Sequence, residues 1–352
     1  MEMSTVSLLP PSVTLVIANF NHAQYLPESL GSIIAQTRAP DRVLIIDDAS
    51  TDDSLNVISR FVNDNPSWKL IRHDQNVGVV PRQNEAIRLI DTDWIGFLGA
   101  DDALHPTYLE KTLAHAARFP QAGLICACTE IIGISQARAL RPVILPERQA
   151  TFVTPDYLLK LLRVGDNYHS GTVTLYRRTA LTALGGFDEE LGSFADGLRA
   201  RELALRFGFF FVPEILGYWR IHELNYSTSM LTDPAILSAK LGQIRALIAG
   251  NEAFPRNYAD LFERRLRFGA SRVVISGNLA TSTKADRVSA LLNFRQAEKR
   301  RLKLVLSFGR FGKIAALAWA TLRTRPLSLV RLVTQIPTRR AIVAARTPYR
   351  PP

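Results

Sequence analysis

The sequence predicts an α/β fold with a mostly parallel sheet, followed by a basic, mainly helical C-terminal region. Apolar, β-branched runs alternate with segments of helical length and period over roughly the first 230 residues. After residue 231 no run of comparable strand character occurs, and Arg, Leu and Ala become abundant. Because single cores seldom grow far beyond about 250 residues, we expect two domains, at 1–230 and 231–352.

Four apolar runs that end in polar residues predict the first strands, at 12–19, 42–48, 68–74 and 93–102. The segments between them have helical length and period, at 23–36, 54–63 and 82–90. A series in which strands and helices alternate implies a parallel sheet, and strands that are apolar on both faces agree with this.

The later part of the first domain continues this alternation less regularly. His105 and Pro106 open a helix that runs through residue 119, and 122–132 is a fifth apolar strand. Residues 135–154 look like a linker. The remaining expected elements are a strand at 172–177, a helix at 196–207 and an extended segment at 209–222.

The composition bears on the compartment. Cys126 and Cys128 are separated by one residue, so on a strand their side chains point the same way, which is an awkward geometry for a disulfide. We expect two reduced core cysteines, which fits a reducing cytosol. The N-terminal residues do not resemble a secretory signal, and the longest apolar run, 314–320, is far shorter than the roughly 20 residues that span a bilayer. We expect a cytoplasmic chain that does not cross a membrane.

The charge is divided unevenly along the chain. Residues 1–230 hold 20 Lys and Arg against 26 Asp and Glu, whereas the rest hold 23 against 6. The basic surface is therefore an appended element that contacts something anionic, and the acidic part is where we expect the chemistry.

Carboxylates follow three of the predicted elements at the edge where open α/β sheets bind ligands. Asp47 and Asp48 end the second strand, Asp101 and Asp102 end the fourth, and Asp196 begins a helix after the later strand. Adjacent carboxylates repel each other without a partner. A nucleotide base or ribose would be that partner for the first pair, and Mg²⁺ or Mn²⁺ for the second.

Simpler interpretations exist for each of these acidic segments. Asp52, Asp53 and Ser54 are typical helix caps, Asp101 and Asp102 could form a solvated turn, and Asp196 could be an N-cap. The carboxylates alone would also fit a nucleotidyltransferase. A dehydrogenase and a P-loop enzyme are disfavoured, because neither G-x-G-x-x-G after the first strand nor G-x-x-x-x-G-K-[ST] is present.

Seven ordered motifs carry a family resemblance. They are VTLVIANFNHAQYLPESLGSIIAQT, VLIIDDASTDDS, NVGVVPRQNEAI, WIGFLGADD, LGGFDEEL, FADGLRARELALRFG and YWRIHELNYS. Over residues 12 to about 230 this series resembles, in order and spacing, the family 2 glycosyltransferases of the GT-A fold. The resemblance implies a Rossmann-like domain that binds a nucleotide sugar, in an enzyme of the bacterial cell-surface polysaccharide type.

The resemblance also implies a role for individual residues. The positions that hold the nucleotide match Asn19, Phe20, Asn21 and Asp48, with Asp47 as their neighbour. Asp101 and Asp102 match the last two acids of a DSDD pattern that binds Mg²⁺ or Mn²⁺ and the donor diphosphate, and His222 matches a position near the metal and phosphates. Asn76 and Gly78 lie near the donor, Arg82 is a candidate diphosphate contact, and Asp196 matches the general base.

These positions imply an inverting transferase that uses a nucleoside diphosphate sugar, often a UDP-sugar, and a saccharide or lipid-linked acceptor. Three departures put contacts in doubt: Gly99 replaces the first Asp of DSDD, Ala195 replaces the Glu before the base, and Phe20 replaces a common Tyr. They leave open a catalytically inactive binding protein of the same fold.

The basic segment 296–340 alternates cationic and apolar residues. It is either a helical subdomain with solvated charges or a peripheral contact to an anionic membrane, where each Lys or Arg near the surface contributes about 1 kcal/mol. Gly309 and Gly312 interrupt the pattern. Nucleic acid is disfavoured as a partner, because the acidic first domain would repel its phosphates.

Overall fold

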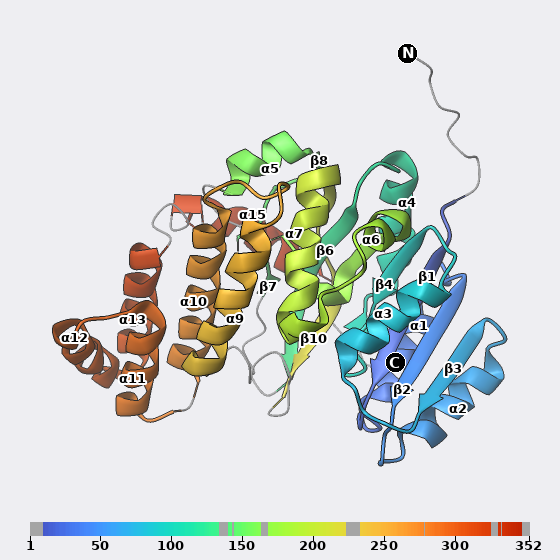
Figure 1. The fold of residues 1–352 in the computed structure, drawn as a ribbon, viewed down its shortest axis with the longest axis horizontal. Coiled ribbons are helices and arrows are strands. Elements are labelled where there is room, and N and C mark those ends of the chain that lie inside the picture. Colours follow the sequence, from blue (N-terminus) through green and yellow to red (C-terminus); the bar gives the residue numbers. More distant parts are fainter. Residues whose placement is uncertain are drawn as a thin grey trace. The chain divides into compact units, whose positions relative to one another are not determined.

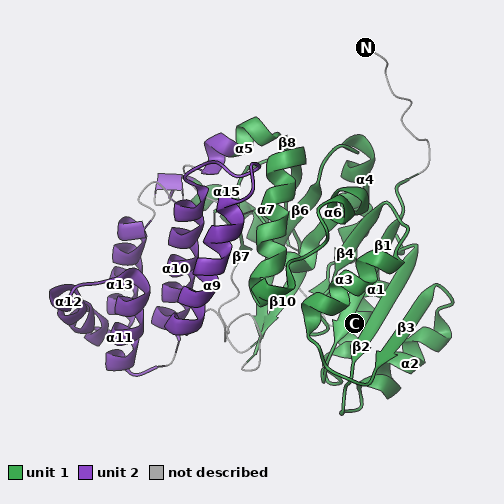
Figure 2. Ribbon diagram, viewed as in Figure 1, with its two compact units in different colours: residues 1–158, 167–222, 335–352 green, residues 159–166, 223–334 purple. Residues whose placement is uncertain are grey.

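The computed structural model describes residues 10–133, 140–142, 144–162, 168–222, 233–277, 279–324, 330–331 and 333–346. The chain divides into two compact units (Figure 2): unit 1 is 1–158, 167–222 and 335–352, and unit 2 is 159–166 and 223–334. The predicted boundary near residue 230 lies within 223–232, outside the described residues. Residues 335–352, which the sequence analysis assigned to the C-terminal region, group with unit 1 instead.

The first half of unit 1 contains the predicted parallel sheet. Its strands are β1 (Val13–Asn19), β2 (Arg42–Asp48), β3 (Trp68–His73) and β4 (Trp94–Phe97). Their order is β3-β2-β1-β4 and every neighbouring pair is parallel. The connecting helices are α1 (Leu26–Ile34), α2 (Ser54–Asp64) and α3 (Val79–Leu89), as Figure 1 shows. β1, β2 and β4 are mainly apolar because side chains on both of their faces are buried, whereas the edge strand β3 is mostly half-buried or exposed.

The second half of unit 1 extends the same sheet with β9 (Thr174–Arg177), β6 (Leu124–Gly133) and β10 (Phe209–Ile221). β6 and β10 are parallel to each other, whereas β9 is inserted between β4 and β6 and is antiparallel to both. The long ladders are therefore parallel, and the predicted α/β class with a mostly parallel sheet is confirmed. Cys126 and Cys128 lie in β6 as buried free thiols, and burial raises the pKa of both.

Three short strands were not expected from the sequence. They are β5 (Ala103–Leu104), β7 (Leu140–Arg141) and β8 (Thr151–Val153). β7 and β8 lie in the segment that we interpreted as a linker, and each pairs antiparallel with a long strand, β6 or β10. Strands of two or three residues carry too little periodicity to be recognised, so their pairing with distant strands decides their structure.

Helices complete the described part of unit 1. They are α4 (Tyr108–Arg118), α6 (Arg178–Ala183), α7 (Ala195–Phe207) and α15 (Ile336–Ala344), with two 3₁₀ segments, η1 (Gly171–Val173) and η2 (Glu189–Phe194). α5 (Pro155–Leu162) begins in unit 1 and ends in unit 2. α15 is attached through Gln335, which is buried and hydrogen-bonded to both backbone groups of Leu145, and through Arg346, which pairs with Glu130.

The strand directions bring distant segments to one edge of the sheet. β1 to β4 all end at that edge, and because β9 is antiparallel to β4 it starts there, directly after η1. β6 is antiparallel to β9, so β10, which is parallel to β6, also ends at the same edge. The residues after β1, β2, β4 and β10 and before β9 therefore share the carboxyl edge.

Unit 2 is helical in its described residues, as predicted for the C-terminal region. Its helices are α9 (Pro234–Ala249), α10 (Tyr258–Ser276), α11 (Thr281–Leu292), α12 (Gln296–Ser307) and α13 (Gly309–Thr324). Gly309 has a φ of +59°, and a Cβ at Gly312 would lie 2.0 Å from the Val305 carbonyl oxygen. These glycines therefore permit the sharp reversal between α12 and α13. Among the described helices, none is both long and apolar enough to span a bilayer.

Candidate functional site

Hydrogen bonds join the loop after β1 to the loop after β2. Asn19 is buried at the end of β1 and donates through Nδ2 to Asp47 Oδ2 at 2.8 Å and to Ser50 Oγ at 3.0 Å. Asp47 also accepts from the Ser50 amide and hydroxyl. Asn21, with a φ of +55°, accepts through Oδ1 from the Thr51 amide at 2.7 Å. The Asp47 carboxylate therefore accepts three hydrogen bonds from polar groups of the chain itself.

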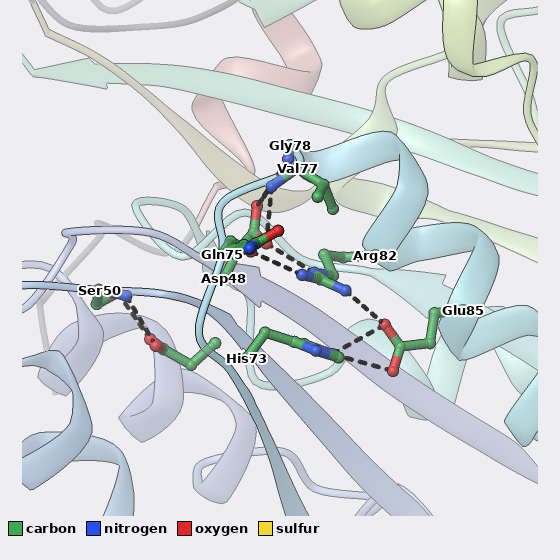
Figure 3. Close-up of polar contacts among 9 residues, drawn as sticks. Asp48, Ser50, His73, Gln75, Val77, Gly78, Arg82 and Glu85 are labelled. Carbon is green, nitrogen blue, oxygen red and sulfur yellow. Dashed lines mark hydrogen bonds and ion pairs between the residues drawn. The ribbon is translucent and has the colours of Figure 1, made fainter.

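Asp48 points into a different network, which Figure 3 shows. It accepts from the amides of Val77 and Gly78, the latter at 2.7 Å, and forms an ion pair with Arg82 Nε at 2.7 Å. Gly78 has a φ of +98°, which brings its amide to the carboxylate at the start of α3. The loop that contains Asn76 and Gly78 is thus attached to the end of β2.

Arg82 is buried, although an exposed helical arginine was the simpler expectation from the sequence. It donates to Asp48, to Glu85 Oε2 at 3.1 Å and to the Gln75 carbonyl at 2.9 Å, and His73 Nε2 contacts both carboxylate oxygens of Glu85 (Figure 3). The partner that the Asp47–Asp48 pair requires is therefore present within the protein. The sequence analysis expected a nucleotide base or ribose as this partner, whereas here groups of the protein itself pair with the two carboxylates.

The second acidic pair lies in the loop between β4 and β5. Asp102 is buried, and its two oxygens accept from Thr172 Oγ1 at 2.5 Å and from the Arg220 amide at 2.9 Å. Burial, and then the neighbouring Asp101 carboxylate, raise the pKa of Asp102 to about 8. A Cβ at Gly99 would lie 2.8 Å from Asp101 Oδ1 and 2.9 Å from Asp102 Oδ2. Gly99 therefore leaves room for both carboxylates in this arrangement.

Asp101 is the member of this pair that faces imidazoles. Its Oδ2 lies 2.9 Å from His222 Nε2, at the end of β10. One potential ligand atom each from His22, Asp101 and His222 lie within 4.8 Å of one another, and this is the one such group of three or more among the described residues. Asp102 does not belong to it. Burial lowers the pKa of His22, and the Asp101 carboxylate opposes that effect.

Asp196 lies in the first turn of α7, where a carboxylate interacts favourably with the helix dipole. The N-cap of this helix is Phe194, so Asp196 is not the cap that the simpler interpretation proposed. Its side chain is 39% exposed, and its Oδ2 lies 4.0 Å from His169 Nε2. A Cβ at Gly171 would stand 3.0 Å from the same oxygen. The turn η1 thus contacts Asp196 through Gly171 and Asp102 through Thr172.

Phe20 follows β1 with 40% of its surface exposed, between Asn19 and Asn21, which are hydrogen-bonded to the loop after β2. The sequence analysis missed four residues at this edge: His22, His169, Thr172 and Arg220. His22 is separated from Asp101 and His222 by most of the domain, so no local spacing could reveal it. A signal was nevertheless present, because His22 directly follows the loop that the resemblance assigned to the nucleotide.

Comparison with known proteins gives the family of this domain. Residues 14–185 match the model of glycosyl transferase family 2. A PGL/p-HBAD biosynthesis glycosyltransferase of Mycobacterium tuberculosis is 34% identical over 109 residues, and the match spans 31% of this chain and 41% of that protein. An uncharacterized glycosyltransferase of Nostoc is 25% identical over 277 residues, 76% of this chain and 80% of that one.

Solved structures share the fold. Staphylococcus aureus TarS 1–349 in complex with UDP-GlcNAc has a TM-score of 0.60 at 18% identity, covering 90% of each chain. The mannosyltransferase PcManGT of Pyrobaculum calidifontis in complex with GDP-Man and Mn²⁺ has a TM-score of 0.55 at 17% identity, covering 94% of this chain and 88% of that one. The predicted GT-A fold is thus confirmed. Residues 14–185, just under half of the chain, therefore form a domain that matches glycosyl transferase family 2.

Proposed function

We propose that the chain is an inverting glycosyltransferase that moves a sugar from a nucleoside diphosphate sugar, most simply a UDP-sugar, to an acceptor hydroxyl. The observation that carries this proposal is that two chemically distinct groups lie at the carboxyl edge of a family 2 domain. One is Asp101 with its neighbouring imidazoles, and the other is the half-exposed carboxylate of Asp196. Leaving-group stabilisation and proton removal are the two tasks of an inverting transfer.

The hydrogen-bonded loops after β1 and β2 would bind the nucleotide half of the donor. Asn19 Oδ1 is buried and has no hydrogen-bond partner among the described residues, so it would accept a hydrogen bond from a nucleotide only after a local shift exposes it. Phe20 offers an exposed ring beside it, and Asn21 is held in place by the Thr51 amide. Asp47 and Asp48 hold these loops and the Asn76–Gly78 loop in position through their hydrogen bonds.

A divalent cation fits the residues around Asp101. A carboxylate oxygen and a His222 nitrogen lie within hydrogen-bond distance of each other, and both atom types ligate Mn²⁺. When bound, the cation would neutralise the charge that develops on the departing diphosphate. Asp102 would contribute by fixing the loop through Thr172 and Arg220. Arg82 could contact phosphate only after exchanging some of its present hydrogen bonds.

Asp196 would act as the general base that removes the proton from the acceptor hydroxyl. Its side chain is more exposed than those of Asp47 and Asp102, which are buried and hydrogen-bonded to groups of the protein, so it suits this task better. η1 is hydrogen-bonded to Asp102 through Thr172 and lies close to Asp196 at Gly171, so the base is near the proposed cation-binding loop. General-base help of this kind contributes roughly 10² to 10⁴ in rate.

The test uses the full chain with UDP-glucose, UDP-N-acetylglucosamine or GDP-mannose and Mn²⁺, and measures release of the nucleoside diphosphate. Asp196→Asn keeps the size of the side chain but cannot accept the proton, so release should fall by about 10² to 10⁴ while donor affinity persists. Asp91→Asn is the control, because Asp91 forms an exposed ion pair with the first residue of β2, at the opposite edge of the sheet.

Each competing function predicts a different result. A catalytically inactive binding protein would bind a donor without releasing the diphosphate, and a nucleotidyltransferase would release pyrophosphate from a nucleoside triphosphate. If Asp196→Asn retained wild-type release, the base would have to be another acid, with Asp188, Glu189 and Glu190 of the preceding segment as the next residues to replace.

We further propose that the acceptor belongs to surface polysaccharide or glycolipid biosynthesis and that unit 2 contacts an anionic membrane. The reversal between α12 and α13 exposes large apolar side chains, with Phe308 at 68% and Phe311 at 81%. Residues 299–324 contain seven Lys and Arg and no Asp or Glu. Exposed rings in a segment that is rich in cationic residues match a bilayer surface that carries negative charge.

Vesicle co-sedimentation tests this contact. The full chain should pellet with phosphatidylglycerol vesicles at low salt and much less with phosphatidylcholine vesicles, because the cationic side chains are attracted to the anionic headgroups. Phe308→Ser with Phe311→Ser should abolish pelleting, whereas Leu247→Ser, an exposed apolar position in α9, should not. Pelleting that is equal for both kinds of vesicle, or unchanged in the double variant, would contradict the proposal.

A further inference from the structure

His22, Asp101 and His222 come from three parts of unit 1 that are far apart in sequence. His22 lies between β1 and α1, Asp101 between β4 and β5, and His222 directly after β10. Their three potential ligand atoms all lie within 4.8 Å of one another. Ligand atoms around an octahedral divalent ion lie roughly 3 to 4 Å apart, so small side-chain rotations would bring the set to ligating distances.

One observation points to a missing partner at His22. Its Nδ1 atom is buried and has no hydrogen-bond partner among the described residues. The ring interacts with the Phe20 backbone, but Nδ1 makes no hydrogen bond of ordinary length and angle with any described residue, so a buried polar atom lacks the partner that such atoms almost always have. A metal ligand bond would supply it, because imidazole coordinates a metal through exactly one unprotonated nitrogen.

Neighbouring side chains hold the imidazole of His222 in place. Tyr25 stacks on His222 at 5.1 Å between ring centroids. The Arg220 guanidinium in turn lies over the Tyr25 ring, 5.3 Å from its centroid. Arg220 Nε also donates to the Asp101 backbone carbonyl at 2.9 Å. Outer contacts of this kind orient ligands and are a usual feature of metal sites.

We propose that His22, Asp101 and His222 form a three-ligand metal site and that its two imidazoles make the protein prefer Mn²⁺ to Mg²⁺. Mg²⁺ selects oxygen ligands, whereas imidazole nitrogen binds transition metals more strongly. The remaining positions of the ion are left to water and to donor phosphate oxygens. This inference rests on the proposed transferase function, and it assigns to His22 a role that Asp102, with both oxygens already bonded, does not fill.

The test measures binding of Mn²⁺ alone to the full chain by electron paramagnetic resonance, followed by competition with Mg²⁺. His22→Ala should weaken Mn²⁺ binding by at least the roughly 10- to 100-fold that loss of an outer contact costs. Spin-echo modulation from imidazole nitrogen should decrease in the same variant. Since His105 lies outside the group, His105→Ala should leave both readouts unchanged.

A second variant tests the metal preference. His22→Asp replaces a nitrogen ligand with an oxygen ligand, so Mg²⁺ should compete with Mn²⁺ more effectively than it does in the wild-type protein. If His22→Ala bound Mn²⁺ like the wild type while Asp102→Asn did not, the ligand set would be wrong. Diphosphate release by the wild-type protein, measured in parallel, would still stand in that case, so failure of the inference is separate from failure of the proposed function.

Discussion

The two acidic pairs of unit 1 have the same sequence pattern and different surroundings. Asp47 and Asp48 end β2, and their partners are Asn19, Ser50, two amides and the guanidinium of Arg82. Asp101 and Asp102 follow β4, and their partners are a threonine hydroxyl, one amide and the imidazole of His222. The first pair therefore includes a permanent cation, whereas the second faces groups that can share a metal ion.

This difference indicates what each pair does. A carboxylate that is paired with a buried arginine holds loops together, and its charge is already compensated. A carboxylate beside imidazole nitrogens keeps a charge that a divalent cation can compensate. A pair of adjacent acidic residues at the end of a strand thus marks the carboxyl edge of the sheet. The partners of the pair decide whether it holds loops together or binds a ligand.

The largest expected effect on stability comes from breaking the first pair. Arg82→Met should lower the free energy of unfolding by about 3–5 kcal/mol, because it leaves the buried Asp48 carboxylate without its cation. Arg88→Met, an exposed change on the same helix, should stay within about 0.5 kcal/mol. Urea unfolding measures both. A loss below about 1 kcal/mol for Arg82→Met would mean that the amides alone compensate Asp48, and the contrast between the pairs would disappear.

A medium effect should separate the two members of the second pair. Asp102→Ala removes the acceptor of the Thr172 hydroxyl and of the Arg220 amide, so it should cost about 1–3 kcal/mol in urea unfolding. Asp101→Ala should cost less, because Asp101 is more exposed, and should instead weaken Mn²⁺ binding. If Asp101→Ala lost more stability than Asp102→Ala, Asp101 would be the residue that stabilises the loop and Asp102 the available metal ligand.

The smallest effect concerns the glycine that donates to Asp48. Gly78→Ala should cost roughly 1–2 kcal/mol, because a φ of +98° is unfavourable for a residue with a Cβ, while no atom lies within 4 Å of the added methyl group. Thermal unfolding together with Mn²⁺ binding tests this. Metal binding should not change, and a change in metal affinity would indicate that the two acidic pairs are coupled.

Sequence reasoning succeeded where the signal was local and repeated. The strands β1 to β4, β6, β9 and β10 were predicted from apolar runs, and the connecting helices from their period. The short strands β5, β7 and β8 could not be predicted, because two or three residues show no period. The attachment of α15 to unit 1 was also missed, since it depends on single long-range contacts such as that of Gln335 with Leu145.

By itself, the sequence determined the α/β class, the carboxyl edge and the positions of its acids, because hydrophobic periodicity and strand ends are properties of neighbouring residues. Only the tertiary structure decided which acid meets which partner. Arg82 compensates Asp48, Thr172 binds Asp102, and the sheet order brings His22 and His222 to Asp101. These pairings join residues far apart in the chain, and the parallel and antiparallel register of the strands, rather than any local spacing, brings them together.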